Sequence, residues 1–580
     1  MKATAESRAR LLLLLALAAT LVVTLLFPLG ELFVRSLHRM EPVADATGHI
    51  ITGEHYVGAA NYRDYFAHPR LRQSLLNTLW VSGLTTLFAV TLAFLQAYGL
   101  THARVPGRGF HRLAALLPLF APTMLYGLSL VYLFGRQGLV TTGFFGALPG
   151  WNIDLYGPVG IVIAETVYTF PIAFLILLVG LRSIDGRLYE AARTLGASAG
   201  RTFLTVTLPA VRLPLAAAVS AVFLHAFTDF GAPKIVGGNF NVLAVDIYQQ
   251  VVGQQNFNLG AVASLLMLGP AALAFAADRL LARRAGAALT ARSVLHQPRP
   301  RPAVDAAFGV ACAVITLALL VVTLTGVAAA LFDSWPYRLE LTLRHFDFTE
   351  TAGRGPNPLG ISLQLALGTA LVGTPLAFLA AYLVERGRGQ LALRGAVQLL
   401  ATLPLALPGL VIGIAYIFFF NRPTLRLPGL ELANPWGGTV GSLGLLIAAT
   451  VVHFLAVSYL TAASAIRQLD REFEACAESL GVPFWTTLRR VTLPVCLPAL
   501  LEIAGYFFVS AMSTISAVIF LYAPETRPAA VAVVNMDDAG DQAAAAALCA
   551  LILLVNVGAK LLVEGASHLL TGRTQRWRRA

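Results

Sequence analysis

Twelve long apolar runs constrain the fold of this chain more than any other feature of its sequence. A helix needs about 20 apolar residues to cross the hydrocarbon core of a bilayer, which is about 30 Å thick. Runs of that length cover residues 11–34, 75–100, 112–135, 158–181, 208–230, 259–282, 307–332, 360–384, 395–420, 440–465, 496–522 and 543–566. Since 57% of the 580 residues are hydrophobic and only 12% are charged, a soluble multidomain protein is excluded. The expected fold class is an all-α polytopic membrane protein with about 12 transmembrane helices.

The first run has the basic flank of a signal peptide, with Lys2, Arg8 and Arg10 before it. It continues for more than twenty residues and lacks a clear small-residue cleavage site, so we expect a retained helix. Four cysteines occur without a CxxC pair, and no disulfide framework or metal site is expected.

The distribution of basic residues predicts the topology. With the N-terminus inside, 29 of the 42 Lys and Arg residues fall on cytoplasmic connectors, tails and their borders, against 13 outside. The positive-inside rule therefore places both termini in the cytoplasm. The net charge of +12 lies on short connectors that border the spans rather than in a basic domain, so no nucleic-acid partner is expected.

The two halves of the chain repeat each other weakly at an offset of 284 to 286 residues. Pro118, Pro122 and Gly127 fall over Pro404, Pro408 and Gly413 in the third run of each half. Because each half holds six spans, an even number, the two repeats should be parallel in the membrane. The predicted organisation is a first repeat over 1–283, a Pro-rich cytoplasmic linker over 284–306 and a second repeat over 307–580.

A polar connector before the fifth span of each half predicts a short helix, a turn and a second short helix. The first connector covers residues 183–209, with Asp185 as the N-cap, Gly196 as the C-cap and a stop before Pro209. The second covers 468–494, in which Asp470, Gly481 and Pro494 take the same places and Pro483 begins the second helix.

These connectors resemble the EAA loops of ABC importer permeases, which receive their substrate from a binding protein. The resemblance rests on Glu190-Ala191-Ala192, Gly196, Val206, Leu208 and Pro209. It covers nearly the whole chain and implies the type I permease fold of that family, with two copies of an ATPase subunit docked on the loops. The implied contact residues are Glu190, Ala191, Ala192, Gly196, Leu208 and Pro209 in the first loop, and Glu474, Ala475, Gly481, Leu493 and Pro494 in the second.

The second loop departs from the pattern, because Ala475-Cys476-Ala477 stands where the first loop has Glu190-Ala191-Ala192, and Glu474 lies one residue early. The chain also lacks GxxxxGK[ST], the phosphate-binding motif of ATPases. The chain is therefore expected not to be an enzyme and to hold no cofactor, with ATP and Mg²⁺ on the partner subunits.

Within that family the chain is similar to the fused permeases for ferric iron, thiamine and phosphonates. Residues 227–257 and 513–541 resemble those of 2-aminoethylphosphonate importer permeases most closely. The resemblance implies a bacterial inner-membrane protein that imports 2-aminoethylphosphonate. Import of ferric iron, thiamine or a polyamine is the alternative. The outer loops 35–74, 136–157, 231–258, 333–359 and 421–439 would dock a periplasmic binding protein.

The resemblance implies that the fifth spans of the two halves face the translocation path, so the polar residues at their ends are the candidate path residues. Ionisable groups inside a membrane are costly, which makes them functional candidates. The candidate path residues are His225, Thr228, Asp229, Ser513, Thr514 and Ser516. The alternative is that Asp229 lies at the outer water boundary and that the hydroxyls bond their own helices. Glu165 and Glu502 are open to both interpretations, and no catalytic residues or metal ligands are expected.

A proton-coupled secondary transporter with two parallel six-helix halves is a further alternative. Residues 101–112, THARVPGRGFHR, lack the acidic residue and the Gly/Asp/Arg pattern expected after the second span of such a carrier. A soluble-type enzyme motif inside the spans, such as HExxH or GxSxG, is also missing.

Overall fold

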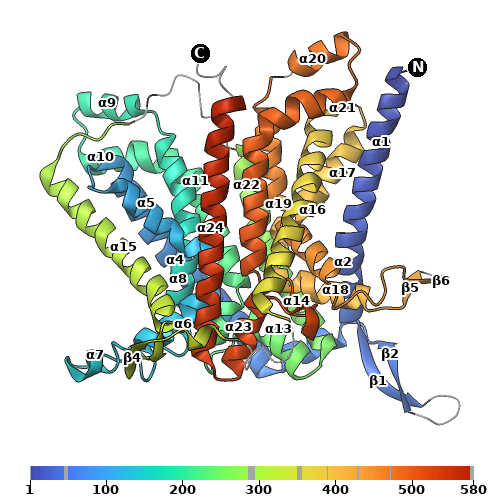
Figure 1. Cartoon of the computed structure of the whole chain (residues 1–580), viewed down its shortest axis with the longest axis horizontal. Helices are drawn as coiled ribbons and strands as arrows, with labels where there is room; N and C mark the ends of the chain where they lie inside the picture. The colour runs from blue at the N-terminus through green and yellow to red at the C-terminus, as the bar shows by residue number, and fades with distance from the viewer. Residues whose placement is uncertain are drawn as a thin grey trace.

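The computed structural model describes residues 2–44, 50–284, 294, 296–348, 356–387, 389–427, 430–470 and 472–574. Within these residues ten helices are long and apolar enough to cross a membrane, and two bent helix pairs raise the number to twelve if each pair is one span. The helices stand side by side as a bundle (Figure 1). The all-α membrane fold predicted from the apolar runs is confirmed.

The elements of the two halves follow each other in a closely similar order. The first half contains α1 (Lys2–Leu21), α2 (Phe27–Ser36), β1 (His38–Ala44), β2 (Ile50–Tyr56), α3 (Ala60–Ala67), α4 (Pro69–His102), α5 (Arg108–Leu116), α6 (Thr123–Phe134), α7 (Gly143–Gly146), α8 (Pro158–Arg182), α9 (Gly186–Thr194), α10 (Ala199–Thr202), α11 (Leu208–Thr228), α12 (Gly231–Val236), α13 (Leu243–Tyr248) and α14 (Phe257–Arg284). The second half contains α15 (Pro302–Ala329), β3 (Phe332–Ser334), β4 (Arg338–Leu341), α16 (Pro358–Arg386), α17 (Leu391–Thr402), α18 (Gly409–Phe420), β5 (Thr424–Leu427), β6 (Leu430–Ala433), α19 (Leu443–Arg467), α20 (Glu472–Ser479), α21 (Phe484–Thr487), α22 (Leu493–Ser513), α23 (Ala529–Asp538) and α24 (Gln542–Thr574).

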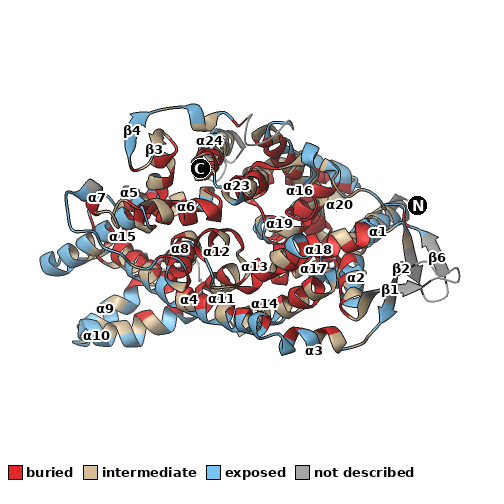
Figure 2. Ribbon diagram, turned by 90° about the horizontal axis from the view of Figure 1, so that it is seen from below, coloured by how far each residue is buried: buried red, intermediate tan, exposed pale blue. Residues whose placement is uncertain are grey.

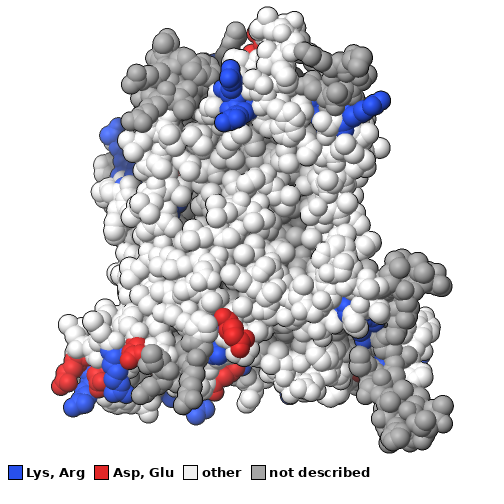
Figure 3. Space-filling view, turned by 45° about the vertical axis from the view of Figure 1, so that its right-hand side comes forward, with Lys and Arg blue, Asp and Glu red and all other residues white. Residues whose placement is uncertain are grey.

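The two ends of the bundle differ in what they carry. Helices α9 and α20 lie at one end, together with the start of α1 and the end of α24, and we call this the loop end (Figure 1). The antiparallel hairpins β1–β2, β3–β4 and β5–β6 lie at the other, the hairpin end. Charged side chains gather at both ends and leave an uncharged belt between them on the face seen in Figure 3. Since the two repeated loops lie at one end, the repeats run parallel.

The third span of each half is broken, which the sequence prediction of one straight helix over 112–135 and over 395–420 missed. The helix direction bends by 105° at the break in the first half and by 113° at the break in the second. The cause is Pro122 and Pro408, which lack an N–H group and force the residue before them out of the helical region. Accordingly, Ala121 and Leu407 have extended backbones, with ψ of 152° and 114°.

Side chains from neighbouring positions satisfy the carbonyl groups that the first break leaves open. The Tyr126 hydroxyl donates a hydrogen bond to the Pro118 carbonyl at 2.6 Å. The Asn556 side-chain amide on α24 donates to the Phe120 carbonyl at 2.8 Å. Because an unpaired carbonyl in a membrane costs several kcal/mol, these two bonds make the break tolerable.

The first span of each half packs against the other half, so the predicted boundary at 284–306 does not separate two bodies in space. Helices α1 and α2 contact α17 and α18, whereas α15 contacts α4, α5 and α6. Seen from the hairpin end, α1 and α2 lie at one side of the bundle beside the second half, and α15 lies beside α5 at the other side (Figure 2).

Polar contacts join the first span of each half to the helices of the other half. The Tyr416 hydroxyl donates to the Thr24 carbonyl at 2.7 Å, and Arg422 forms an ion pair with Glu31 at 2.9 Å. On the other side, the Thr316 hydroxyl of α15 bonds the His111 ring at 2.8 Å. The exchange ties the two halves together on both sides.

The packing of α15 on α4 can be tested at Gly99. A Cβ atom at Gly99 would lie 3.0 Å from Cys312 Sγ and 3.1 Å from Phe308 Cδ1, whereas one at Gly83 on the same helix meets no atom within 4 Å. Overpacking costs about 1–3 kcal/mol. We expect Gly99→Leu to lower the midpoint of thermal unfolding in detergent and Gly83→Leu to leave it nearly unchanged. Equal effects of the two variants would contradict the exchanged position of α15.

Candidate functional site

The two loop helices, α9 and α20, are built by the same local interactions. Asp185 accepts a hydrogen bond from the Arg187 amide at 3.0 Å, and Asp470 accepts one from the Glu472 amide at 3.1 Å. Both helices end on a glycine in the left-handed region, with φ of +74° at Gly196 and +65° at Gly481. The caps predicted from the sequence are confirmed.

The loop helices present their predicted contact residues to solvent. Glu190, Ala191, Gly196 and Pro209 are exposed in the first loop, as are Ala475 and Gly481 in the second, while Ala192, Leu208, Glu474, Leu493 and Pro494 are half-buried. Leu195 and Leu480 stand 285 residues apart and are 85% and 74% exposed. Large apolar side chains are thus exposed at matching places of the two repeats.

The second short helix of each loop does not stop at the proline, contrary to the sequence prediction. The helix that begins at Ala199 runs without interruption for 30 residues to Thr228, and the equivalent one runs from Phe484 to Ser513. A π-helical turn precedes each proline, at Phe203–Thr207 and at Leu488–Thr492.

The π turn explains how the helix passes the proline. The Leu208 amide bonds the Phe203 carbonyl, five residues back, and the Leu493 amide bonds the Leu488 carbonyl in the same way. The wider turn makes room for a residue that cannot donate a backbone hydrogen bond. Each loop is therefore joined to the membrane interior by one helix about 45 Å long, at ~1.5 Å per residue.

The acidic residues of the two loops differ in their partners. Glu190 is exposed, whereas Glu474 forms an ion pair with Arg386 at 2.8 Å. Arg386 is nearly buried and also donates to the carbonyl groups of Ile466 and Leu469, at 2.7 and 2.6 Å. Glu474 thus holds α20 against the ends of α16 and α19, a role that the sequence did not indicate.

The described residues of the linker between the halves, 294 and 296–306, lie against the first loop and the end of α4. The Gly186 amide donates to the Val294 carbonyl at 2.8 Å. The ring of His296 packs on Tyr189 and on His102, with ring centroids 4.4 and 5.1 Å apart. Burial lowers the pKa of His296 and raises that of Tyr189 to about 12. These contacts favour a neutral His296.

A cavity of about 780 Å³ lies between the two halves. Its walls come from η2 (Leu117–Phe120), α6, α8, α11 and α14 of the first half, and from η6 (Leu403–Ala406), α18, α19, α22 and α24 of the second. Both helix breaks open on it, because Pro122, Thr123, Pro408 and Gly409 are in its walls. The helices that rise from the two loops, α11 and α22, also end on it.

All six predicted path residues lie in the walls of this cavity: His225, Thr228, Asp229, Ser513, Thr514 and Ser516. The structure brings them together from the ends of α11 and α22, while their role in transport stays a prediction. The hydroxyls of Thr228 and Ser513 bond carbonyl groups of their own helices at 2.9 and 2.8 Å, as the alternative interpretation expected.

Further polar groups of the wall were not predicted, because they are single residues in apolar runs. They are Tyr168, His453, Tyr506, Ser510 and Lys560. Glu502, which the sequence left open, lines the cavity and forms an ion pair with Lys560 at 2.9 Å. Glu165 is fully buried beside Asp229. Polar residues that recur at every third or fourth position place their side chains on one face of a helix. This spacing, on the helices of one half, is the sequence signal that could have identified these wall residues.

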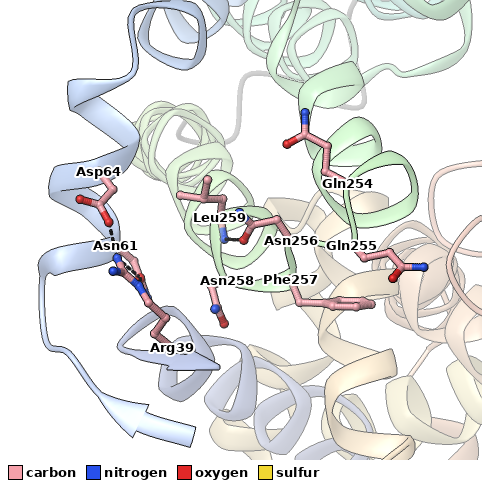
Figure 4. A pocket seen from close by; sticks show the side chains of 9 residues that line it. All are labelled: Arg39, Asn61, Asp64, Gln254, Gln255, Asn256, Phe257, Asn258 and Leu259. Carbon is pink, nitrogen blue, oxygen red and sulfur yellow. Dashed lines mark hydrogen bonds and ion pairs between the residues drawn. The ribbon is translucent and has the colours of Figure 1, made fainter. Parts of the chain in front are cut away.

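A second hollow, of about 430 Å³, lies at the hairpin end (Figure 4). Arg39 of β1 bridges Asn61 and Asp64 of α3 on one side of it, bonding Asn61 Oδ1 at 3.0 Å. Residues Gln254 to Leu259, before and at the start of α14, form the other side. The predicted outer loops 35–74 and 231–258 thus meet in one surface.

Comparison with known proteins identifies the class. The sequence profile of the binding-protein-dependent transport system inner membrane component family matches residues 81–287 and 373–566, which is more than half of the chain. The chain belongs to this family, and it is a multi-pass permease subunit of an ABC importer. The family excludes the secondary-transporter alternative.

Individual relatives are named for the transport of different substrates. The ferric transport system permease protein FbpB of Actinobacillus pleuropneumoniae is 27% identical over 494 residues, covering 83% of this chain and 69% of the relative. The thiamine transport system permease protein ThiP of Escherichia coli (strain K12) is 23% identical over 421 residues, covering 72% and 74%. Among solved structures, a bacterial ABC transporter involved in the import of alginate is 18% identical with a TM-score of 0.35, covering 40% of this chain and 85% of that one.

The contact of the linker with α9 should depend on pH through His296. Its pKa is lowered from the ordinary 6.5 by burial, against the attraction of Glu190 and alongside the repulsion of Arg193 and Arg301. His296 in a released linker therefore has the higher pKa and binds a proton more readily than His296 packed against α9. The contact is complete above pH 6.5 and weakens as the pH falls below it. We expect the hydrogen-exchange protection of the Gly186 amide to fall between pH 7.5 and about pH 5.5.

The matched control is His296→Gln, which cannot take up a proton. Its Gly186 amide should show the same protection at both pH values. A pH-dependent loss of protection in His296→Gln equal to that of the parent would show that another group is responsible.

Proposed function

We propose that this chain forms the path of an ATP-driven importer for 2-aminoethylphosphonate. The observation that carries the proposal is the cavity between the halves, which joins both helix breaks to the helices α11 and α22 that rise from the two loops. Its polar groups include carboxylates and hydroxyls, which suit a substrate with one positive and one negative end. The likeness of residues 227–257 and 513–541 to 2-aminoethylphosphonate permeases supports this substrate.

Ferric iron is the second candidate substrate. The observation that favours it is the similarity to ferric transport permeases over most of the chain. A hard cation would use oxygen ligands, and Glu165, Asp229 and Tyr168 offer carboxylate and phenol oxygens at the cavity.

In the proposed cycle, two copies of an ATPase subunit bind the loop end from the cytoplasm, and ATP and Mg²⁺ bind to those subunits. The exposed Glu190, Leu195 and Leu480 form the contact. When the ATPase subunits close, α9 and α20 move with them. The uninterrupted helices 199–228 and 484–513 carry that motion to the cavity. A substrate-loaded periplasmic binding protein docks on the hairpin end, and both chain termini lie in the cytoplasm.

The substrate is tested by uptake in cells that carry or lack the gene, offered labelled 2-aminoethylphosphonate and labelled ferric iron in parallel. We expect loss of the phosphonate signal alone when the gene is absent. Loss of iron uptake alone would support the assignment as an importer and would show that ferric iron, not 2-aminoethylphosphonate, is the substrate.

Coupling is tested by Glu190→Arg combined with Gly196→Lys, which reverses the charge of α9 and forces a side chain into a backbone with φ of +74°. We expect ATP-dependent uptake to fall by about tenfold or more while the ATPase subunits still hydrolyse ATP, as for loss of at least ~1.4 kcal/mol at the contact. Uptake and ATP hydrolysis are measured together in proteoliposomes. The control Glu564→Gln changes an exposed carboxylate of α24, outside both loops and the hairpin end, and should keep both rates. Full coupling in the double variant would refute the docking of α9.

A further inference from the structure

Two carboxylates meet behind the cavity wall, and one of them has no hydrogen-bond donor. Glu165 lies on α8 three and seven residues before Tyr168 and Ile172, so it shares their face, which lines the cavity. Its side chain is fully buried, and neither carboxylate oxygen accepts a hydrogen bond from any described group. The group that interacts with it is the carboxylate of Asp229, which lines the cavity itself.

Two ionised carboxylates in contact, away from water, repel each other strongly, so the pair must hold a proton or a cationic group. No neighbouring lysine supplies the charge, because Lys560 is paired with Glu502 at 2.9 Å and Lys234 with Asp538 at 2.7 Å. His225 does not supply it in its neutral form either. Its Nδ1–H donates to the Ala221 carbonyl at 2.8 Å, which leaves Nε2 as an acceptor.

The surroundings distinguish the two carboxyl groups. Asp229 accepts a hydrogen bond from the Ala232 amide at 2.9 Å and interacts with Thr123, the first residue of α6, where the helix dipole favours a negative charge. Glu165 has neither kind of support. Asp229 is therefore the ionised member, and Glu165 is the member that carries the shared proton.

The second repeat shows that the fold does not need this pair. The positions 285 residues after Glu165 and Asp229 are Thr450 and Thr514. Asp229 and Thr514 have the same backbone conformation, with φ of −69° and −73° and ψ of 141° and 134°, each directly after its helix. The second half thus forms the same helix end with two threonine hydroxyls. The two carboxylates of the first half therefore serve something other than folding.

We propose that the Glu165–Asp229 pair, with its shared proton retained, is a subsite for one organic ammonium group during transit. This inference rests on the proposed function and assigns the amine end of its substrate. The pair with one proton has a net charge of −1, which a single ammonium group balances.

The opposite wall fits the anionic end of the same molecule. Helix α18 begins there at Gly409, with the hydroxyl of Ser516 so close that a Cβ atom on Gly409 would lie 2.2 Å from its Oγ. Thr514 stands where the first half has Asp229. A helix start with hydroxyls and no carboxylate at the equivalent position suits a phosphonate oxygen.

The test uses the purified full-length chain in detergent and a hydrophobic carbodiimide, which reacts with protonated carboxyl groups in apolar surroundings. Labelled peptides are read by mass spectrometry. We expect Glu165 to be modified, and millimolar 2-aminoethylphosphonate or ethanolamine to slow its total modification by about tenfold, where the carbodiimide adduct and any amide formed with the amine are counted together. Ethylphosphonate, which has no amine, should not protect. Absence of labelling at Glu165, or equal protection by ethylphosphonate, would overturn the proposal, and so would protection by ferric citrate alone.

Uptake by variants provides the second measurement. Glu165→Gln, Glu165→Thr and Asp229→Thr should lower uptake of 2-aminoethylphosphonate by about tenfold or more at unchanged membrane levels, because a charge-assisted hydrogen bond is lost. The threonine variants copy residues that the second half already accommodates, so they guard against misfolding. Glu564→Gln, on the exposed side of α24, is the matched control. Full uptake by Asp229→Thr and Glu165→Thr would overturn the subsite.

The two proposals fail in different ways. If the parent chain takes up no 2-aminoethylphosphonate while ethanolamine still protects Glu165, the substrate is wrong and the ammonium subsite stands. If uptake is present but amines give no protection, the substrate stands and the subsite is refuted.

Discussion

Inside a bilayer every backbone N–H and C=O group must find its hydrogen-bond partner within the protein, and the rest of this structure depends on how that demand is met. Most of the chain meets it with uninterrupted helices. The two breaks, at Pro122 and Pro408, occur where the helices border a cavity rather than lipid. At the first break Tyr126 and Asn556 supply the missing donors, and Asn556 comes from the far half of the chain. The breaks turn two helix starts toward the cavity, whose walls are mostly apolar with polar side chains among them.

The same demand shapes the link between the loops and the cavity. A proline inside a helix normally kinks or ends it. Here the π turns at Phe203–Thr207 and Leu488–Thr492 absorb Pro209 and Pro494, and the helices continue to the cavity. Each of these helices reaches from the loop end to the cavity, where Asp229 or Thr514 directly follows its last residue. The exchanged spans α1 and α15 hold the two halves together.

The backbone elements of the two halves are closely symmetric, whereas the polar side chains that they carry are not. Caps, π turns and breaks recur at an offset of 285 or 286 residues. Yet Glu190 is exposed while Glu474 is held by Arg386, and the linker residues that the structure describes lie against the first loop. Beside the cavity, Glu165 and Asp229 of the first half correspond to Thr450 and Thr514 of the second. A substrate with two unlike ends needs such a difference between walls, whereas a symmetric pair of walls would hold either end equally well.

The sequence by itself determined the membrane class, the twelve apolar segments, the parallel repeats and the caps of the loop helices. These follow from local length, charge and spacing, because a capping Asp or a C-terminal Gly acts within one helical turn. It also named six residues of the cavity wall, since polar groups in apolar runs are few. The tertiary structure decided which elements meet across long stretches of chain: α1 with α17, Asn556 with Phe120, Arg386 with Glu474, and Glu165 with Asp229. Those contacts depend on how helices pack in three dimensions, and helix periodicity fixes only which face a residue occupies, never which helix will lie against it.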